Sequence, residues 1–174
     1  MLLYAPASAS SLLVAGGYLG GVGPISAPVT VGGAGILSPG TNQIVGTLAI
    51  NGNLTLQDTV QIDVNKDLVG ETNDLVTGVQ TLAYGGSLVV NNLGTNALML
   101  GATFQLFSAV SAAGNFISIT LAPGAGLSWS FNAGSGVLSV VTGIATTPTN
   151  ITFSLNGCNT LELAWPESHL VWIV

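Results

Sequence analysis

The chain has 174 residues, of which 48% are hydrophobic, only 5% are charged, and 24 are glycine. A typical soluble domain carries about 25% charged residues, and disordered chains combine low hydrophobicity with high net charge, so this composition excludes a disordered tail. The net charge is −6 with Lys66 as the single lysine or arginine, which argues against nucleic acid and anionic membranes as partners.

The first 18 residues are apolar and rich in alanine and serine, and APASA at residues 5–9 resembles a signal-peptidase site. No basic segment precedes it, so we expect any export signal to lie upstream of Met1. Gly, Ser, Pro or Asn interrupts every apolar run before it reaches the roughly 18 to 20 residues that a membrane helix needs. The sequence therefore predicts no direct membrane span.

Apolar and polar residues alternate along much of the chain, as they do in half-buried β-strands. In residues 60–64, the three apolar side chains share one face, and Gln61 and Asp63 share the other. Similar apolar stripes begin at Leu54, Leu88, Phe104, Leu127, Leu138 and Ile151. Clusters rich in Gly and Asn separate them about every ten residues, which predicts an all-β meander, sandwich or solenoid.

An internal repeat favours the solenoid. Shifting the chain by 26 residues aligns Gly52 with Gly78, Thr55 with Thr81, Leu56 with Leu82, and Val64 with Val90. Each copy then forms one coil of a parallel β-solenoid in which like residues stack. We therefore expect residues 54–64 and 80–90 to lie in register one above the other. A β-sandwich with two similar hairpins is the alternative.

Several short motifs occur in a recognisable order. They are GGAGILSPG at residues 32–40, IVGTL at 44–48, NGNLTL at 51–56, TNDLVTG at 72–78 and GLSW at 126–129. This order resembles bacterial autotransporter-associated β-strand repeat proteins, at the C-terminal end of their repeat region, over roughly residues 13–141. The resemblance implies a right-handed parallel β-helix that is exported to the cell surface, and it implies no catalytic activity.

The sequence pattern changes after Val141. We expect a β-solenoid repeat region at residues 1–141, a Thr/Pro linker at 142–150, and a short β-hairpin, partial β-sandwich module or cap at 151–174. The run LAWPESHLVW at residues 163–172 resembles the LSWP..HLGW pattern that follows the repeat region in large bacterial surface proteins. Here Val171 replaces the usual glycine of that pattern.

Five of the seven carboxylates lie between Asp58 and Asp74. Within this stretch, Asp63, Asn65, Asp67 and Asp74 occupy positions one, three, five and twelve of a calcium-loop spacing. Leu68 stands where such a loop needs glycine, and position twelve is Asp rather than Glu. The four residues are a candidate calcium site, and a solvated loop between coils is the alternative.

The residues needed for catalysis are sparse. His169 is the single histidine and Cys158 the single cysteine, and neither has a base or an acidic cluster beside it in sequence. We therefore expect no enzymatic activity and no obligatory cofactor. The expected function is a structural or adhesive segment of a secreted bacterial surface protein, with flanking domains of a longer chain as partners. A module that binds surface glycans is one alternative, and a glycan-active β-helix enzyme is a disfavoured one.

Overall fold

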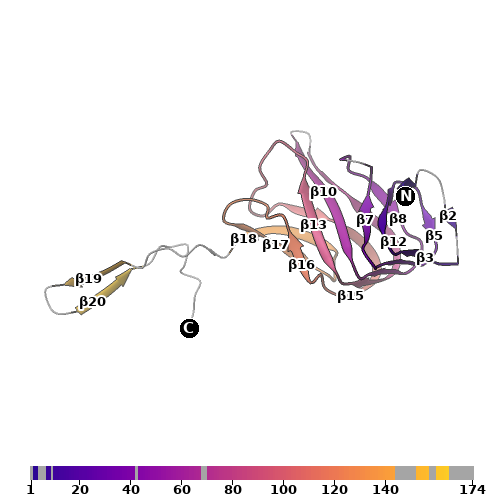
Figure 1. Ribbon diagram of the computed structural model, residues 1–174. Coiled ribbons are helices and arrows are strands. Elements are labelled where there is room, and N and C mark those ends of the chain that lie inside the picture. Colours follow the sequence, from indigo (N-terminus) through magenta and orange to yellow (C-terminus); the bar gives the residue numbers. More distant parts are fainter. Residues whose placement is uncertain are drawn as a thin grey trace.

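The computed structural model describes residues 2–3, 7–8, 10–41, 43–67, 70–143, 152–156 and 160–164. In this part of the chain every regular element is a β-strand (Figure 1). The prediction of an all-β, solenoid-like fold is confirmed at this level, because parallel strands stack in two sheets.

The first sheet runs along one side of the stack in the order β1-β4-β7-β10-β13-β16, and all neighbours on this path are parallel. Its strands are β1 (Leu2–Leu3), β4 (Gly17–Gly21), β7 (Gly35–Pro39), β10 (Thr59–Asp67), β13 (Ser87–Asn92) and β16 (Ser118–Thr120). Strand β11 (Gly70–Asn73) folds back on the end of β10 as an antiparallel hairpin.

The second sheet has the order β15-β12-β9-β6-β3, and β8 also pairs with β12. Its strands are β3 (Leu12–Val14), β6 (Val29–Val31), β8 (Thr47–Ala49), β9 (Leu54–Leu56), β12 (Leu75–Tyr84) and β15 (Phe107–Gly114). A short parallel pair, β2 (Ala7–Ser8) with β5 (Ile25–Ser26), forms a third side near the N-terminus.

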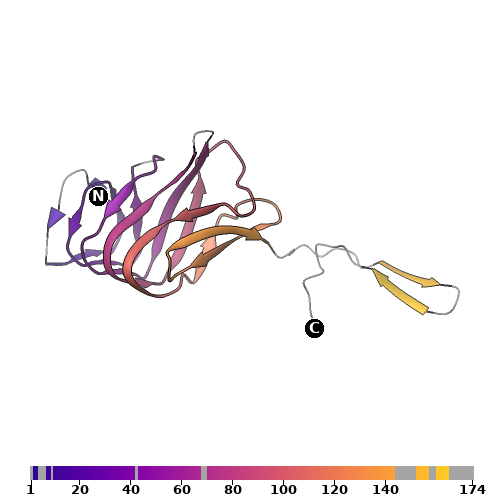
Figure 2. The same ribbon diagram turned by 180° about the vertical axis from the view of Figure 1, so that it is seen from behind.

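The chain alternates between the two sheets, so each circuit forms one coil, and the coils can be followed from indigo to orange in Figures 1 and 2. The coils lengthen along the chain. Residues that pair across neighbouring coils of the first sheet are 18 apart at Gly17 and Gly35, and 31 apart at Ser87 and Ser118. Successive coils therefore repeat the same arrangement of strands, although they differ in length.

Residues 54–64 and 80–90 do lie one above the other, as the repeat predicts, but the predicted offset of 26 is wrong. Leu54 pairs with Leu82 and Thr59 pairs with Ser87, which is an offset of 28. The corner turn sets this register: a Cβ on Gly86, whose φ is +63°, would lie 2.0 Å from the Asp58 carbonyl oxygen. Because 26 and 28 differ by two residues, the inward side chains of the strands stay inward.

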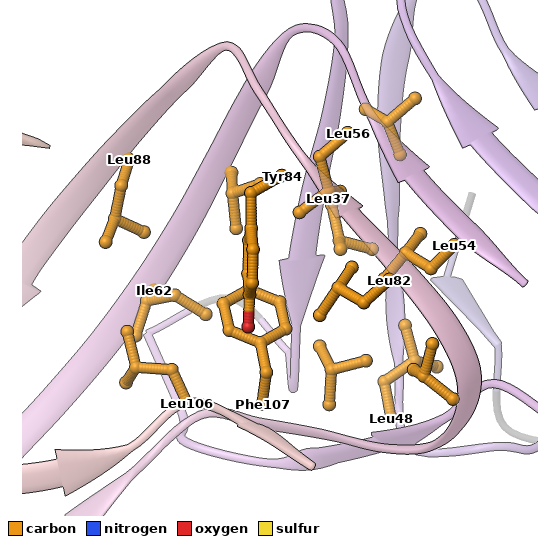
Figure 3. Close-up of a cluster of buried hydrophobic side chains, with 14 of the residues drawn as sticks. Leu37, Leu48, Leu54, Leu56, Ile62, Leu82, Tyr84, Leu88, Leu106 and Phe107 are labelled. Atoms are coloured by element: carbon orange, nitrogen blue, oxygen red, sulfur yellow. The ribbon is translucent and has the colours of Figure 1, made fainter. Parts of the chain in front are cut away.

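The core is a set of side-chain columns between the two sheets. In the first sheet, Leu19, Leu37, Val60, Leu88 and Ile119 follow one another on five successive strands. The first four of these are at most 1% exposed. Figure 3 shows the side chains from both sheets converging on this interior. Each buried aliphatic side chain contributes about 1.5–3 kcal/mol of transfer free energy, so the column is the main source of stability.

An aromatic cluster covers the C-terminal end of the coils. A third, antiparallel sheet there consists of β14 (Thr103–Gln105), β18 (Val137–Thr142) and β17 (Leu127–Asn132). Phe131 on β17 lies 5.0 Å from the Tyr84 ring centroid and 5.1 Å from that of Phe116. The Tyr84–Phe131 pair is edge-to-face and the Phe116–Phe131 pair is tilted, and rings in such arrangements attract one another beyond their burial of area. This antiparallel sheet therefore packs as a cap on the last coils.

The C-terminal region contributes one further element among the described residues. Strand β19 (Thr152–Asn156) pairs with β20 (Thr160–Ala164) as an antiparallel hairpin. The linker expected at 142–150 lies almost entirely outside the described residues, as do Cys158 and His169. The domain boundaries therefore stay predictions.

Candidate functional site

A groove crosses the outer face of the first sheet in the described coils. Its volume is about 620 Å³, and strands β4, β7, β10 and β13 form its floor. The lining residues are Tyr18, Gly20, Ser38, Gly40, Thr41, Gln43, Gln61, Asp63, Asn91 and Leu93. Small-molecule sites in proteins have similar volumes, so the groove is large enough for a short ligand.

Strand alternation explains which side chains reach the groove. Val60, Ile62 and Val64 point inward and are 0% exposed, as the sequence predicts, so Gln61 and Asp63 point outward. Neither Gly20 nor Gly40 has a side chain that would fill the hollow.

A tight turn forms one wall of the groove. The Ile44 N–H donates to the Thr41 carbonyl at 2.7 Å, and the Thr41 N–H donates back to the Ile44 carbonyl at 3.2 Å. Gly40 begins this turn with φ +77°, and a Cβ there would lie 2.3 Å from the Ile44 carbonyl oxygen. Gln43 has φ +58°, which is a conformation that residues other than glycine adopt at a cost. Gln43 lines the groove from this turn.

Asp63 is a nearly buried carboxylate in the groove floor. It is 6% exposed, and its Oδ1 accepts a hydrogen bond of 2.9 Å from the Asn91 side-chain amide. The two residues are direct partners on the parallel strands β10 and β13. The neighbouring coil therefore holds one oxygen of this carboxylate in place.

Asp74 lies behind this floor and is fully buried. Its Oδ1 accepts a 2.8 Å hydrogen bond from the Gly46 N–H, and its Oδ2 accepts a 2.9 Å hydrogen bond from the Asp63 N–H. Burial raises the pKa of Asp74 to about 7, and the nearby Asp63 carboxylate adds to the rise, although the two backbone hydrogen bonds oppose it. The Asp74 side chain thus links the chain segment before β8 to strand β10.

This pKa predicts that stability changes with pH. The ordinary pKa of 3.8 applies in the unfolded chain, so the folded state binds the Asp74 proton more tightly. The stabilisation that comes from this tighter proton binding is therefore fully present below about pH 4. It is lost as pH rises through about 7, which lowers the free energy of unfolding by a few kcal/mol. Urea unfolding across this range measures it. The free energy of unfolding of an Asp74→Asn variant should change less with pH than that of the wild type. An equal change with pH in both proteins would contradict a raised pKa for Asp74.

The four residues of the predicted calcium site are only partly brought together. Asp63 and Asp74 are neighbours, but each already accepts hydrogen bonds from the protein. The buried Asn65 Oδ1 has no hydrogen-bond partner, and the side chain of Asp67 lies outside the described part. Within the described ranges, no three His, Cys, Asp or Glu side chains are grouped to hold a metal. Calcium binding stays a prediction.

The alternative of a solvated loop for the acidic stretch is wrong for two of its members. Asp63 is 6% exposed and Asp74 is 0% exposed. Asp63 lies in strand β10, and Asp74 lies between β11 and β12. The alternation of residue types places Asp63 on the outer face of its strand. It cannot show that a hairpin later in the chain and a neighbouring coil cover this position. The paired backbone donors of Asp63 and Gly46 are the tertiary feature that sequence reasoning missed.

Asp58 and Trp129 have structural roles. Asp58 Oδ2 accepts a 2.7 Å hydrogen bond from the N–H of Ala34, whose φ is +72°, and this hydrogen bond lowers the pKa of Asp58. It joins the corner turns of two successive coils. Trp129 is half-buried, packs edge-on against Phe104 and donates its ring N–H to the Leu121 carbonyl at 2.8 Å. Trp129 therefore supports the C-terminal sheet rather than an exposed aromatic row.

Comparison with known proteins identifies no relative. The chain matches no protein-family model, no curated protein and no solved structure. Among the described residues, no helix is long and apolar enough to cross a membrane. The geometry of the described residues is therefore the basis for a functional proposal.

Proposed function

We propose that this chain is a structural or adhesive segment of a secreted bacterial surface protein, and that it acts as a rigid stalk or passenger without catalysis. The proposed fold is a right-handed parallel β-helix of the autotransporter-associated repeat type. The main support is the continuous stack: strand β3 is joined through β6, β9 and β12 to β15 by parallel ladders. A stack of this kind resists bending because every coil packs on its neighbours.

The roles of the carboxylates support a function without catalysis. Asp58, Asp63 and Asp74 are the acidic residues whose side chains are described, and each accepts a hydrogen bond from the protein itself. A glycan hydrolase instead needs two carboxylates placed on either side of the scissile bond. These three side chains stabilise corners and strands.

The low charge of the edge strands supports flanking domains of a longer chain as partners. The edge strands β15 and β16 contain Ser, Thr, Ala and apolar residues but no lysine. Lysine is a common guard of exposed sheet edges, and a neighbouring domain can replace it by covering the edge. We propose that flanking parts of a longer chain provide this cover.

Distance measurement between two spin labels tests the stalk. Leu13 and Ala113 belong to the same row of the second sheet, four strand spacings apart, and both are exposed. Their Cα atoms should therefore lie about 19 Å apart. With Cys158 replaced by serine, a Leu13→Cys, Ala113→Cys protein should give one narrow distribution near this separation.

A protein labelled only at Leu13→Cys is the matched control, because any distance it shows arises between molecules. A broad or bimodal distribution in the doubly labelled protein, absent from the control, would contradict a rigid stack. A separation that changes on warming below the unfolding transition would do the same.

A carbohydrate-binding or surface-binding module is the second candidate function. The groove on the first sheet favours it, because a half-exposed aromatic ring and several planar polar side chains meet in one hollow. A stalk and a binding face are compatible on one solenoid.

A further inference from the structure

We infer that the groove on the first sheet binds a short, neutral oligosaccharide across strands β4, β7, β10 and β13. This inference deepens the second candidate function and does not depend on the stalk. The four strands are consecutive neighbours in the sheet, so the groove floor spans about 14 Å. A length of this order accommodates a few sugar units laid across the strands.

Tyr18 provides a stacking surface at one end. It lies on β4, is 55% exposed and lines the groove. A sugar ring presents one face of C–H groups, and an aromatic side chain offers a matching apolar body with a polar tip. Gly20 follows two residues later on the same side of the strand, also lines the groove and places no side chain in it.

Polar side chains from β10 and β13 line another part of the groove. Gln61 and Asp63 lie two residues apart on β10, and Asn91 lies beside Asp63 on β13. The Asn91 amide is oriented by its 2.9 Å hydrogen bond to Asp63 Oδ1, and both residues line the groove. Amides that both donate and accept, next to a carboxylate acceptor, match neighbouring hydroxyls of a sugar.

The charges select a neutral sugar over an acidic one. Asp63 contributes a carboxylate to the floor, and none of the groove-lining residues is a lysine or arginine. The chain as a whole carries a net charge of −6. An acidic glycan would therefore bring its carboxylates toward like charge, without a lysine or arginine among the groove-lining residues to pair with.

Titration by NMR of the full 174-residue chain tests the site. The probes are cellotetraose, xylotetraose, mannotetraose, maltotetraose and N-acetylchitotetraose, with tetragalacturonate as the acidic comparison. We expect at least one neutral sugar to cause saturable shifts at the amides of Gly20, Gln61 and Asn91. Tyr18→Ala should weaken that binding by about tenfold, because the stacking surface is lost. Tyr18→Phe should retain it.

Leu13→Ala is the matched control, because Leu13 is similarly exposed but lies on the second sheet. It should leave sugar binding unchanged. The inference is overturned if none of the five neutral sugars gives saturable shifts, or if Tyr18→Ala and Gln61→Ala leave the affinity intact. Preferential binding of tetragalacturonate would also overturn it. Any of these results would leave the spin-label test of the stalk unaffected.

Discussion

Asp74→Ala should lower the free energy of unfolding by about 3 kcal/mol or more, because it leaves two backbone donors without a partner. The Asp63 N–H is buried and the Gly46 N–H is partly buried, and both donate to the Asp74 carboxylate. Each unsatisfied buried donor costs about 1–3 kcal/mol, and the lost side-chain volume adds a cavity. Urea unfolding monitored by circular dichroism measures the loss.

Asp74→Asn is the matched variant because it keeps the shape and one acceptor oxygen. Its amide nitrogen cannot accept the second hydrogen bond, so its loss of stability should be intermediate. At pH 8 the wild-type Asp74 carboxyl is largely ionised. The difference in the free energy of unfolding between Asp74→Asn and the wild type should therefore be smaller at pH 8 than at pH 5. Equal stability of Asp74→Ala and wild type would show that the two hydrogen bonds do not stabilise the coils.

Leu82→Ala should destabilise the fold by about 2–5 kcal/mol, the range found for buried Leu→Ala substitutions. Leu82 is 0% exposed on β12, with Leu54 below it on β9 and Ala112 above it on β15. Parallel ladders hold the backbone on both sides, so the site cannot collapse to fill the cavity. The midpoint of urea unfolding should fall with little change in its slope.

The control for this prediction is the same substitution at an exposed position. Leu13 is 66% exposed on the outer face of β3, so Leu13→Ala removes the same atoms with far less change in burial. Its effect should stay within about 0.5 kcal/mol, which is usual for surface changes. If both substitutions cost the same, the inner column would not be the source of stability that its burial indicates.

The alternation of residue types was sufficient to assign the inner face of the strands. Val60, Ile62 and Val64 were expected on one face, and all three are 0% exposed. The stacking of residues 54–64 beneath 80–90 was likewise predicted, and the two segments do pair in parallel. The predicted offset differs from the observed one by two residues because it aligns identical residues such as Thr55 and Thr81. The actual partner of Thr55 is Ala83.

The candidate groove had no counterpart in the sequence prediction. Tyr18 and Asn91 are separated by more than seventy positions, and only the ladder through β7 and β10 places them on one face. The coils between them differ in length, so no fixed period could have aligned these residues. The burial of Asp74 was hidden for a related reason, since its donors belong to segments 11 and 28 positions away.

The order of residues was enough to predict an all-β chain of stacked parallel coils and the inward-pointing side chains of residues 60–64. These properties follow from the two-residue period of a strand and from turn residues, both of which act over short distances along the chain. The register between coils, the hydrogen bonds of Asp63 and Asp74, and the groove become visible only in the folded chain. Each of these depends on close contacts between successive coils, such as Gly86 against the Asp58 carbonyl, which the local pattern of residues does not specify.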